Sequence, residues 1–80
     1  MVFSRITGVG HYLPKKIMTN EDLSNFVDTN DEWIITRTGI KQRHIAEDSE
    51  LTSQLAIKAS KEAIKNAKLS PSNIDYIIVA

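Results

Sequence analysis

The sequence has no cysteine among its 80 residues, and it has only two histidines, His11 and His44. A chain without cysteine can form no disulfide framework and can supply no cysteine nucleophile. Two histidines so far apart in the sequence predict no zinc site. Because the reducing cytosol favours proteins without disulfides, we expect a cytoplasmic protein.

An excess of charge and long apolar runs are also missing. Ten basic residues balance ten acidic ones, whereas a general nucleic-acid binder usually has a basic excess. No run of about 18 apolar residues occurs, and the N-terminus lacks the pattern of a signal peptide, so we expect no membrane partner. The hydrophobic share of 41% is ordinary for a globular protein, and 80 residues allow at most one small domain.

Periodicity and turn residues divide the chain into short elements. In the first half we predict a strand over residues 2–13, a helix over residues 20–27 capped by Thr19, and a helix that runs from a Thr29–Glu32 capping box through Arg37 and stops at Gly39. A short strand or extended arm is predicted over residues 40–45. In the second half we predict a helix over residues 50–68, ended by Ser70 and Pro71, and then a strand over residues 74–80. The unbroken apolar end of the last strand indicates burial on both faces, as in a parallel sheet. The chain is therefore predicted to be α/β, with a right-handed strand–helix–strand crossover.

Small residues on two of these elements indicate close packing. Gly8 and Gly10 fall on one face of the first predicted strand, and a face without side chains lets a helix or another backbone come close. The long helix carries a stripe that recurs every four residues, namely Leu55, Ala59, Ala63 and Ala67. The lysines on its other side, with Glu62 between them, are typical of a solvated face. A dinucleotide motif is excluded, because Leu13 stands where a third glycine is needed.

One short segment concentrates side chains suited to a ligand. Trp33 and Arg37 are four residues apart, so on a helix they share a face. A nucleotide base can stack on the indole while a phosphate pairs with the guanidinium. The residues alone also allow Trp33 to pack at a helix edge with Arg37 stacked on it, without any ligand. His11 and His44 have no nucleophile beside them in sequence and are typical of structural histidines.

Three motifs closely resemble one enzyme family: ITGVGHYLP from Ile6, TNEDL from Thr19 and DTNDEWIITRTGIKQRHIA from Asp28. The family is β-ketoacyl-acyl-carrier-protein synthase III, the initiating condensing enzymes of bacterial type II fatty-acid synthesis. The resemblance covers nearly the whole chain and implies a thiolase-like fold. It implies that residues 1–80 form the N-terminal part of the first thiolase-like domain and stop within a strand after the long helix.

The resemblance also implies an activity. Such an acyltransferase joins an acyl-CoA primer, such as acetyl-CoA, to malonyl-acyl carrier protein, works as a cytoplasmic homodimer, and needs no cofactor or metal beyond its coenzyme A thioester substrate. The residues of the family that match Trp33 and Arg37 flank the adenine of coenzyme A, and the match to Thr29 lies at the same end.

The catalytic cysteine, histidine and asparagine of the family lie beyond residue 80, so we expect no catalytic residue in this chain and no activity from it alone. Two alternatives remain open. One is a related thiolase-fold acyltransferase with another acceptor, and the other is a small non-catalytic module that binds nucleotides or a partner.

Overall fold

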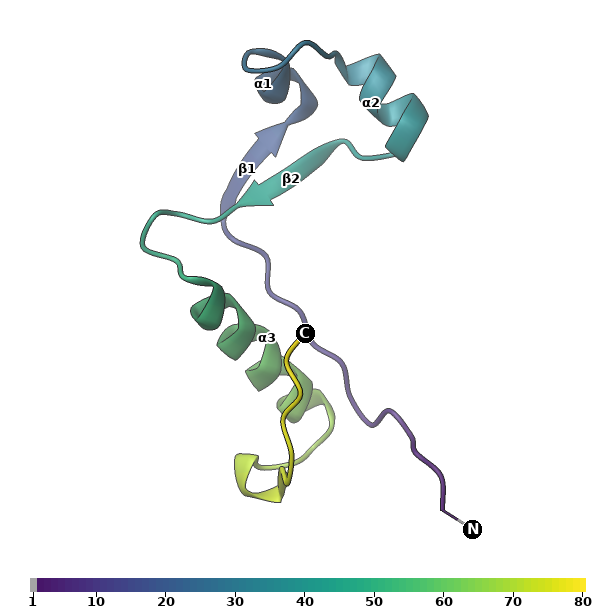
Figure 1. The fold of residues 1–80 in the computed structure, drawn as a ribbon, viewed down its shortest axis with the longest axis vertical. Coiled ribbons are helices and arrows are strands. Elements are labelled where there is room, and N and C mark those ends of the chain that lie inside the picture. The colour runs from purple at the N-terminus through teal and green to yellow at the C-terminus, as the bar shows by residue number, and fades with distance from the viewer. Residues whose placement is uncertain (1) are drawn as a thin grey trace. The chain divides into compact units, whose positions relative to one another are not determined.

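The computed structural model describes residues 2–80, with six short elements in chain order. They are β1 (Lys16–Thr19), α1 (Asn20–Ser24), α2 (Asp31–Thr38), β2 (Gln42–Ile45), α3 (Thr52–Asn66) and the 3-10 turn η1 (Pro71–Asn73) (Figure 1). The chain forms two compact units. We call Leu13–Leu51 the β unit, and the chain up to Tyr12 together with Thr52–Ala80 the α3 unit. None of the helices within residues 2–80 has the length and apolar character needed to cross a bilayer.

The β unit is built on a two-stranded antiparallel sheet. β1 pairs with β2 in a register that sets Lys16 opposite Ile45 and Thr19 opposite Gln42. β2 confirms the short strand predicted within residues 40–45. Its partner β1 was not predicted, because a four-residue strand shows little alternation and is fixed by pairing rather than by its own pattern.

The start of α1 agrees with its predicted cap, but its end does not. The Thr19 hydroxyl accepts a hydrogen bond from the backbone N–H of Asp22 at 3.1 Å, and the Asp22 carboxylate accepts one from Thr19 N at 2.9 Å. The prediction that the helix reaches residue 27 is wrong, since α1 ends at Ser24. Phe26 and Val27 are 75% and 50% exposed, so no packing favours a further turn.

The cap of the helix α2 lies one residue later than predicted. The side chain of Asn30, not that of Thr29, accepts the hydrogen bond from Trp33 N at 2.8 Å. The predicted Thr29–Glu32 capping box is therefore wrong, and it is replaced by a cap of the residue type that ranks above threonine at this position. The predicted stop is confirmed, because Gly39 ends the helix in the left-handed region with a φ of 72°.

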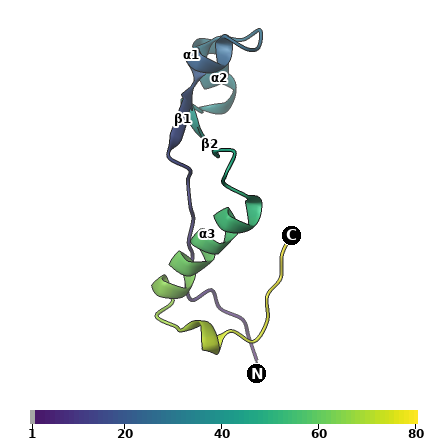
Figure 2. The ribbon, with the colours of Figure 1, turned by 90° about the vertical axis from the view of Figure 1, so that its left-hand side faces the viewer.

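The close packing predicted for the glycine face is confirmed in the α3 unit, where the partner proves to be the alanine stripe. A methyl group added at Gly8 would meet the carbonyl oxygen of Ala63 at 2.7 Å, and one added at Gly10 would come closer still to backbone atoms of Ala59 and Ala63. The N-terminal run and α3 lie side by side in both views (Figures 1 and 2). The stripe residues Leu55, Ala59, Ala63 and Ala67 are all half-buried.

Polar contacts hold the same run to α3. Asn66 donates a hydrogen bond to the carbonyl of Val9 at 2.9 Å. Lys58 lies 4.5 Å from the centre of the Tyr12 ring and donates to its hydroxyl at 3.3 Å. The lysine face of the helix is exposed as predicted, but Lys58 also anchors the N-terminal run.

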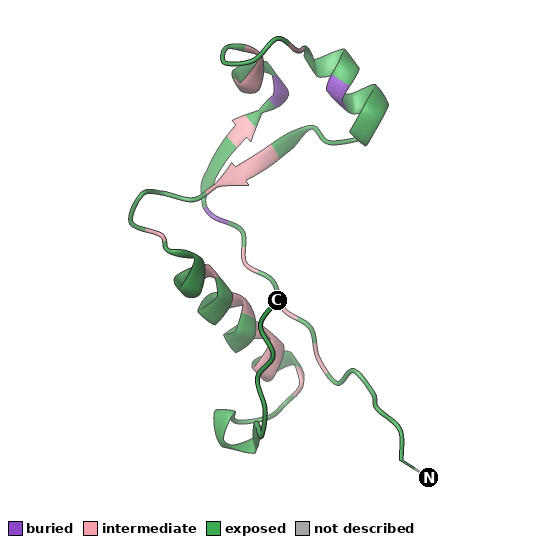
Figure 3. Ribbon diagram, in the orientation of Figure 1, coloured by how far each residue is buried: buried purple, intermediate pink, exposed green. Residues whose placement is uncertain are grey.

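The two flanking runs, residues 2–13 and 74–80, do not form the predicted strands. They are extended but make no sheet within residues 2–80, so the predicted parallel crossover is not formed. A strand needs a hydrogen-bonded neighbour, and these runs are open to solvent, as the green ends of the ribbon show (Figure 3). Val2 is 99% exposed and Ile78 is 87% exposed.

The helix α3 is two residues shorter at each end than the predicted range of 50–68. Its end is set by Lys68, which adopts a left-handed φ of 59° before the predicted Ser70–Pro71 stop is reached. The N–H of Leu69 then bonds back to the carbonyl of Ile64 at 3.2 Å. This reversal satisfies a carbonyl that would otherwise be left open at the helix end.

Candidate functional site

The helix α2 presents Trp33 and Arg37 together on one face. The Arg37 guanidinium carbon lies 5.3 Å from the centre of the Trp33 ring, within the range of a cation–π contact. Trp33 remains 54% exposed and Arg37 is exposed as well. The prediction that the two side chains share one face of a helix is therefore confirmed, and both remain open to solvent.

Two shallow depressions meet at the Trp33 indole. One, of about 340 Å³, is lined by Asn30, Glu32, Trp33, Thr36 and Arg37. The other, of about 150 Å³, is lined by Asp28, Thr29, Asn30 and Trp33. Thr29, Trp33 and Arg37, which the sequence singled out, thus gather around one aromatic ring.

Thr29 contributes a polar atom that the described residues leave unsatisfied. Its hydroxyl oxygen is buried and has no hydrogen-bond partner within residues 2–80. A buried hydroxyl without a partner is unfavourable by about 1–3 kcal/mol. Because Thr29 lines the smaller depression, a donor or acceptor placed there could satisfy this hydroxyl.

Charge is unevenly distributed around the indole. Asp28 and Glu32 line the two depressions, and Arg37 is the single basic residue among the lining side chains. A phosphate would be repelled by the carboxylates and attracted by the guanidinium. The site is therefore suited to stacking a base on Trp33, with any negative charge directed toward Arg37.

The two histidines take no part in this site. The ring nitrogen Nδ1 of His44 lies 2.5 Å from the carbonyl oxygen of Pro14. His11 lies 3.6 Å from the Glu62 carboxylate on the surface of the α3 unit. Neither lies beside a nucleophile in these contacts, which agrees with the structural role predicted for both.

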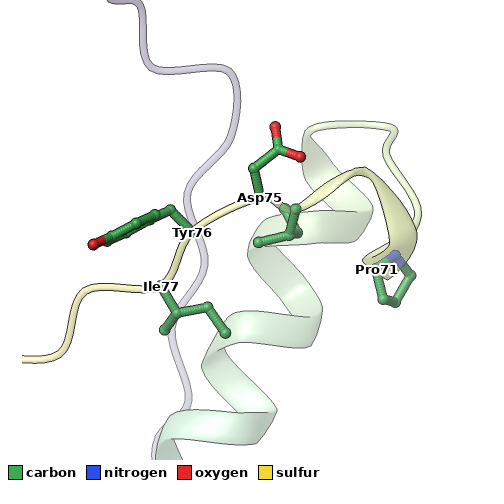
Figure 4. A pocket seen from close by; sticks show the side chains of 5 residues that line it. Pro71, Asp75, Tyr76 and Ile77 are labelled. Atoms are coloured by element: carbon green, nitrogen blue, oxygen red, sulfur yellow. The ribbon is translucent and has the colours of Figure 1, made fainter.

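A third depression, of about 550 Å³, lies on the C-terminal run (Figure 4). It is lined by Pro71, Ile74, Asp75, Tyr76 and Ile77. Asp75 is the only carboxylate in that lining, and Tyr76 is 84% exposed. An open surface with so few converging polar groups does not resemble a ligand site.

Comparison with known proteins supports the relationship suggested by the motifs. No family model matches the chain. The chain is 59% identical over 75 residues to β-ketoacyl-[acyl-carrier-protein] synthase III of Rickettsia canadensis, an alignment that covers 94% of this chain and 24% of that relative. The solved structure of 3-oxoacyl-[acyl-carrier-protein] synthase III from Aquifex aeolicus matches 88% of the chain and 22% of its own, with a TM-score of 0.79 at 54% identity. The chain is thus closely similar to a segment of the β-ketoacyl-[acyl-carrier-protein] synthase III enzymes.

The chain spans about a quarter of the length of the relatives it matches. It is also similar to the priming β-ketosynthase of the R1128 polyketide pathway, with a TM-score of 0.84 at 41% identity over 91% of the chain and 22% of that protein. These likenesses confirm the α/β, thiolase-like fold class. The ligand roles of Thr29, Trp33 and Arg37 stay predictions.

Proposed function

We propose that this segment belongs to a condensing enzyme that joins an acyl-CoA primer to malonyl-acyl carrier protein and so starts fatty-acid synthesis. Within that enzyme, Trp33, Arg37 and Thr29 contribute to the part of the coenzyme A site that holds the adenine. The observation that carries the proposal is the exposed Trp33 ring with the Arg37 guanidinium 5.3 Å from its centre. The enzyme names of the relatives supply the chemical class.

A base that stacks between Trp33 and Arg37 requires Arg37 to move. A base between the indole and the guanidinium makes one contact of about 3.5 Å with each, so the two groups must lie about 7 Å apart. In the structure the Arg37 guanidinium carbon lies only 5.3 Å from the centre of the Trp33 ring. The base therefore takes the place of the guanidinium on the indole, and Arg37, an exposed side chain, rotates to cover the base or to pair with a phosphate. Base stacking of this kind contributes about 1–3 kcal/mol.

Thr29 fits the same ligand. Its unsatisfied buried hydroxyl can donate to, or accept from, a polar atom at the edge of the base or ribose. That contact would turn an unfavourable buried group into a favourable one when the ligand binds. No other cofactor is needed, because the coenzyme A thioester is the substrate itself.

The reaction needs residues that this chain does not supply. In the proposed enzyme a cysteine thiolate attacks the acyl thioester and releases the thiol of coenzyme A. Decarboxylation of the malonyl group then gives the carbanion that attacks the acyl-enzyme, which forms the new carbon–carbon bond, releases carbon dioxide and frees the cysteine. The present sequence contains no cysteine, so its contribution is to bind and orient the primer. We place the enzyme in the cytoplasm as a homodimer.

The test is the kinetics of Trp33→Ala and Arg37→Ala in the full-length enzyme. Both should raise KM for the acyl-CoA primer with little change in kcat, because they remove contacts to a remote part of the substrate. Phe26→Ala is the matched control, since it removes an aromatic ring that is 75% exposed and lines neither depression at Trp33. An unchanged KM in both site variants would remove the coenzyme A assignment.

The likeness to a priming β-ketosynthase favours one second candidate. That enzyme class would use the same primer site but a different acyl carrier protein as acceptor. The two candidates predict the same effect at Trp33 and differ in acceptor preference. Rates with carrier proteins from fatty-acid and polyketide systems, compared at one primer concentration, distinguish them.

A further inference from the structure

A single buried amide holds both ends of the helix that carries the candidate site. Asn20, at the start of α1, is 1% exposed, the lowest value in the described part of the chain. Its Nδ2 donates to the carboxylate of Asp31 at 2.9 Å and to the carbonyl of Ile40 at 2.7 Å. Asp31 is the first residue of α2, and Ile40 follows the glycine that ends it. Both amide hydrogens are therefore used to hold α2 at its two ends.

The remaining atoms of Asn20 tie the same point to the sheet. Its Oδ1 accepts a hydrogen bond from Arg43 Nη2 at 2.6 Å, and its backbone N–H donates to the carbonyl of Lys41 at 3.2 Å. Arg43 Nη1 in turn lies 3.3 Å from the carbonyl oxygens of Met18 and Thr19 on β1. The amide thus fixes α2 relative to β1 and β2 as well as to α1.

The three proposed ligand residues lie between Asn20 and Ile40, the two residues that the Asn20 amide joins by a hydrogen bond. Thr29 precedes α2, while Trp33 and Arg37 lie within it, all between Asn20 and Ile40. Ile34 is the one apolar side chain of α2 that is buried, at 7% exposed, so packing alone holds this helix weakly. The position of the indole and guanidinium therefore depends on the hydrogen bonds of Asn20.

We propose that Asn20 is a positioning residue for acyl-CoA binding, which acts through α2 on Trp33 and Arg37 without touching the ligand. This inference rests on the proposed coenzyme A site and adds to it the residue that sets its geometry. An aspartate at position 20 would keep the acceptor for Arg43 but would lose both donated bonds. It would also place a second carboxylate beside Asp31, which repels it.

The Asn20–Asp31 hydrogen bond can be tested by swapping the two residue types between positions 20 and 31. In the double variant Asn20→Asp/Asp31→Asn, the amide and the carboxylate change places and the bond is made in the reverse direction. In Asp31→Asn alone, the side chain at position 31 still offers an oxygen to Asn20. In Asp31→Ala that acceptor is lost, and because Asp31 is exposed, the variant should fold.

The experiment measures KM for acyl-CoA, kcat and Tm for these variants in the full-length enzyme. Asn20→Asp should raise KM about tenfold and Asp31→Ala about threefold, with kcat and the KM for malonyl-acyl carrier protein unchanged. Asp31→Asn should stay near wild type, and the exchange should return KM to within about threefold of wild type. Asn66→Asp is the matched control, since it also loses a 2.9 Å bond to a carbonyl but lies in the α3 unit.

Two results overturn the inference. A wild-type KM in Asp31→Ala would show that the start of α2 needs no anchor from Asn20, even if Asn20→Asp failed to fold. An exchange variant no better than Asn20→Asp would show that the bond itself is not what sets KM. Trp33→Ala, measured in parallel, distinguishes failure of this inference from failure of the proposed function. If Trp33→Ala raises KM while Asp31→Ala does not, the coenzyme A site is retained and only the positioning role of Asn20 is rejected.

Discussion

Gly10→Ala is the sharpest perturbation that the α3 unit offers. A Cβ at position 10 would come closer than 3.0 Å to the carbonyl oxygen of Ala59 and to the backbone nitrogen of Ala63. Both are backbone atoms of a helix, so neither can move aside as a flexible side chain would. The run and α3 must separate, and overpacking of this kind costs about 1–3 kcal/mol, with the upper end expected for this contact.

A second glycine supplies the matched control. Gly39 has no atom within 4 Å of an added Cβ, but its φ is 72°. Gly39→Ala therefore carries only the penalty of a left-handed backbone, about 1–2 kcal/mol. Asparagine tolerates that conformation, so Gly39→Asn should recover part of the loss, whereas Gly10→Asn should be worse than Gly10→Ala.

The assay is the Tm of the four variants and the wild type in the full-length protein under one set of conditions. We expect Gly10→Asn to melt lowest, then Gly10→Ala, then Gly39→Ala, with Gly39→Asn nearest the wild type. A Gly10→Ala protein that melts with the wild type would refute the close approach of the N-terminal run to α3. The opposite responses of the two glycines to asparagine separate steric from conformational penalties.

Three further predictions concern the chain by itself and its first helix. The purified 80-residue chain should give no β-ketoacyl product above background, because it has no cysteine; product formation by the pure chain would contradict this. The same chain should self-associate in sedimentation runs at rising concentration, because Tyr76, Ile77 and Ile78 are 84%, 78% and 87% exposed and burying an aliphatic side chain contributes about 1.5–3 kcal/mol. A concentration-independent monomer with a sharp melt would be the contrary result. The backbone N–H of Thr19, and then its side chain, lower the pKa of Asp22 below the ordinary 3.8. The stabilisation of α1 by this carboxylate should thus be complete above pH 3.8 and be lost as pH falls through the lowered pKa, which a carboxyl NMR titration of Asp22 measures; a midpoint at or above 3.8 would count against the cap.

Features set by neighbouring residues could be predicted from the sequence. The Thr19 cap, the Gly39 stop and the half-buried stripe of α3 all depend on contacts within a few residues or on a regular period. The pairing of Trp33 with Arg37 is likewise a property of one helix turn.

Features set by distant residues could not be predicted. β1 exists because it pairs with β2, which lies far from it in the sequence. One local feature was also predicted wrongly, since Asn30 and not its neighbour Thr29 caps α2. Asn20 was missed because an asparagine after a capping threonine looks like an ordinary helix start. Its importance comes from Asp31 and Ile40, which are 11 and 20 residues away.

The glycine–alanine packing of the α3 unit has a consequence for synthesis on the ribosome. The hydrogen bonds described above for the β unit join residues up to 30 positions apart, as between Pro14 and His44, so this unit can form while the rest of the chain is still being made. Val9 must instead wait for Asn66, 57 residues later, which takes roughly 3–11 s at about 5–20 residues per second. During that interval Gly8 and Gly10 lack the helix backbone that they approach in the folded unit. The segment around Val9 thus lacks its partner helix during synthesis, and an early-acting chaperone is expected to bind there.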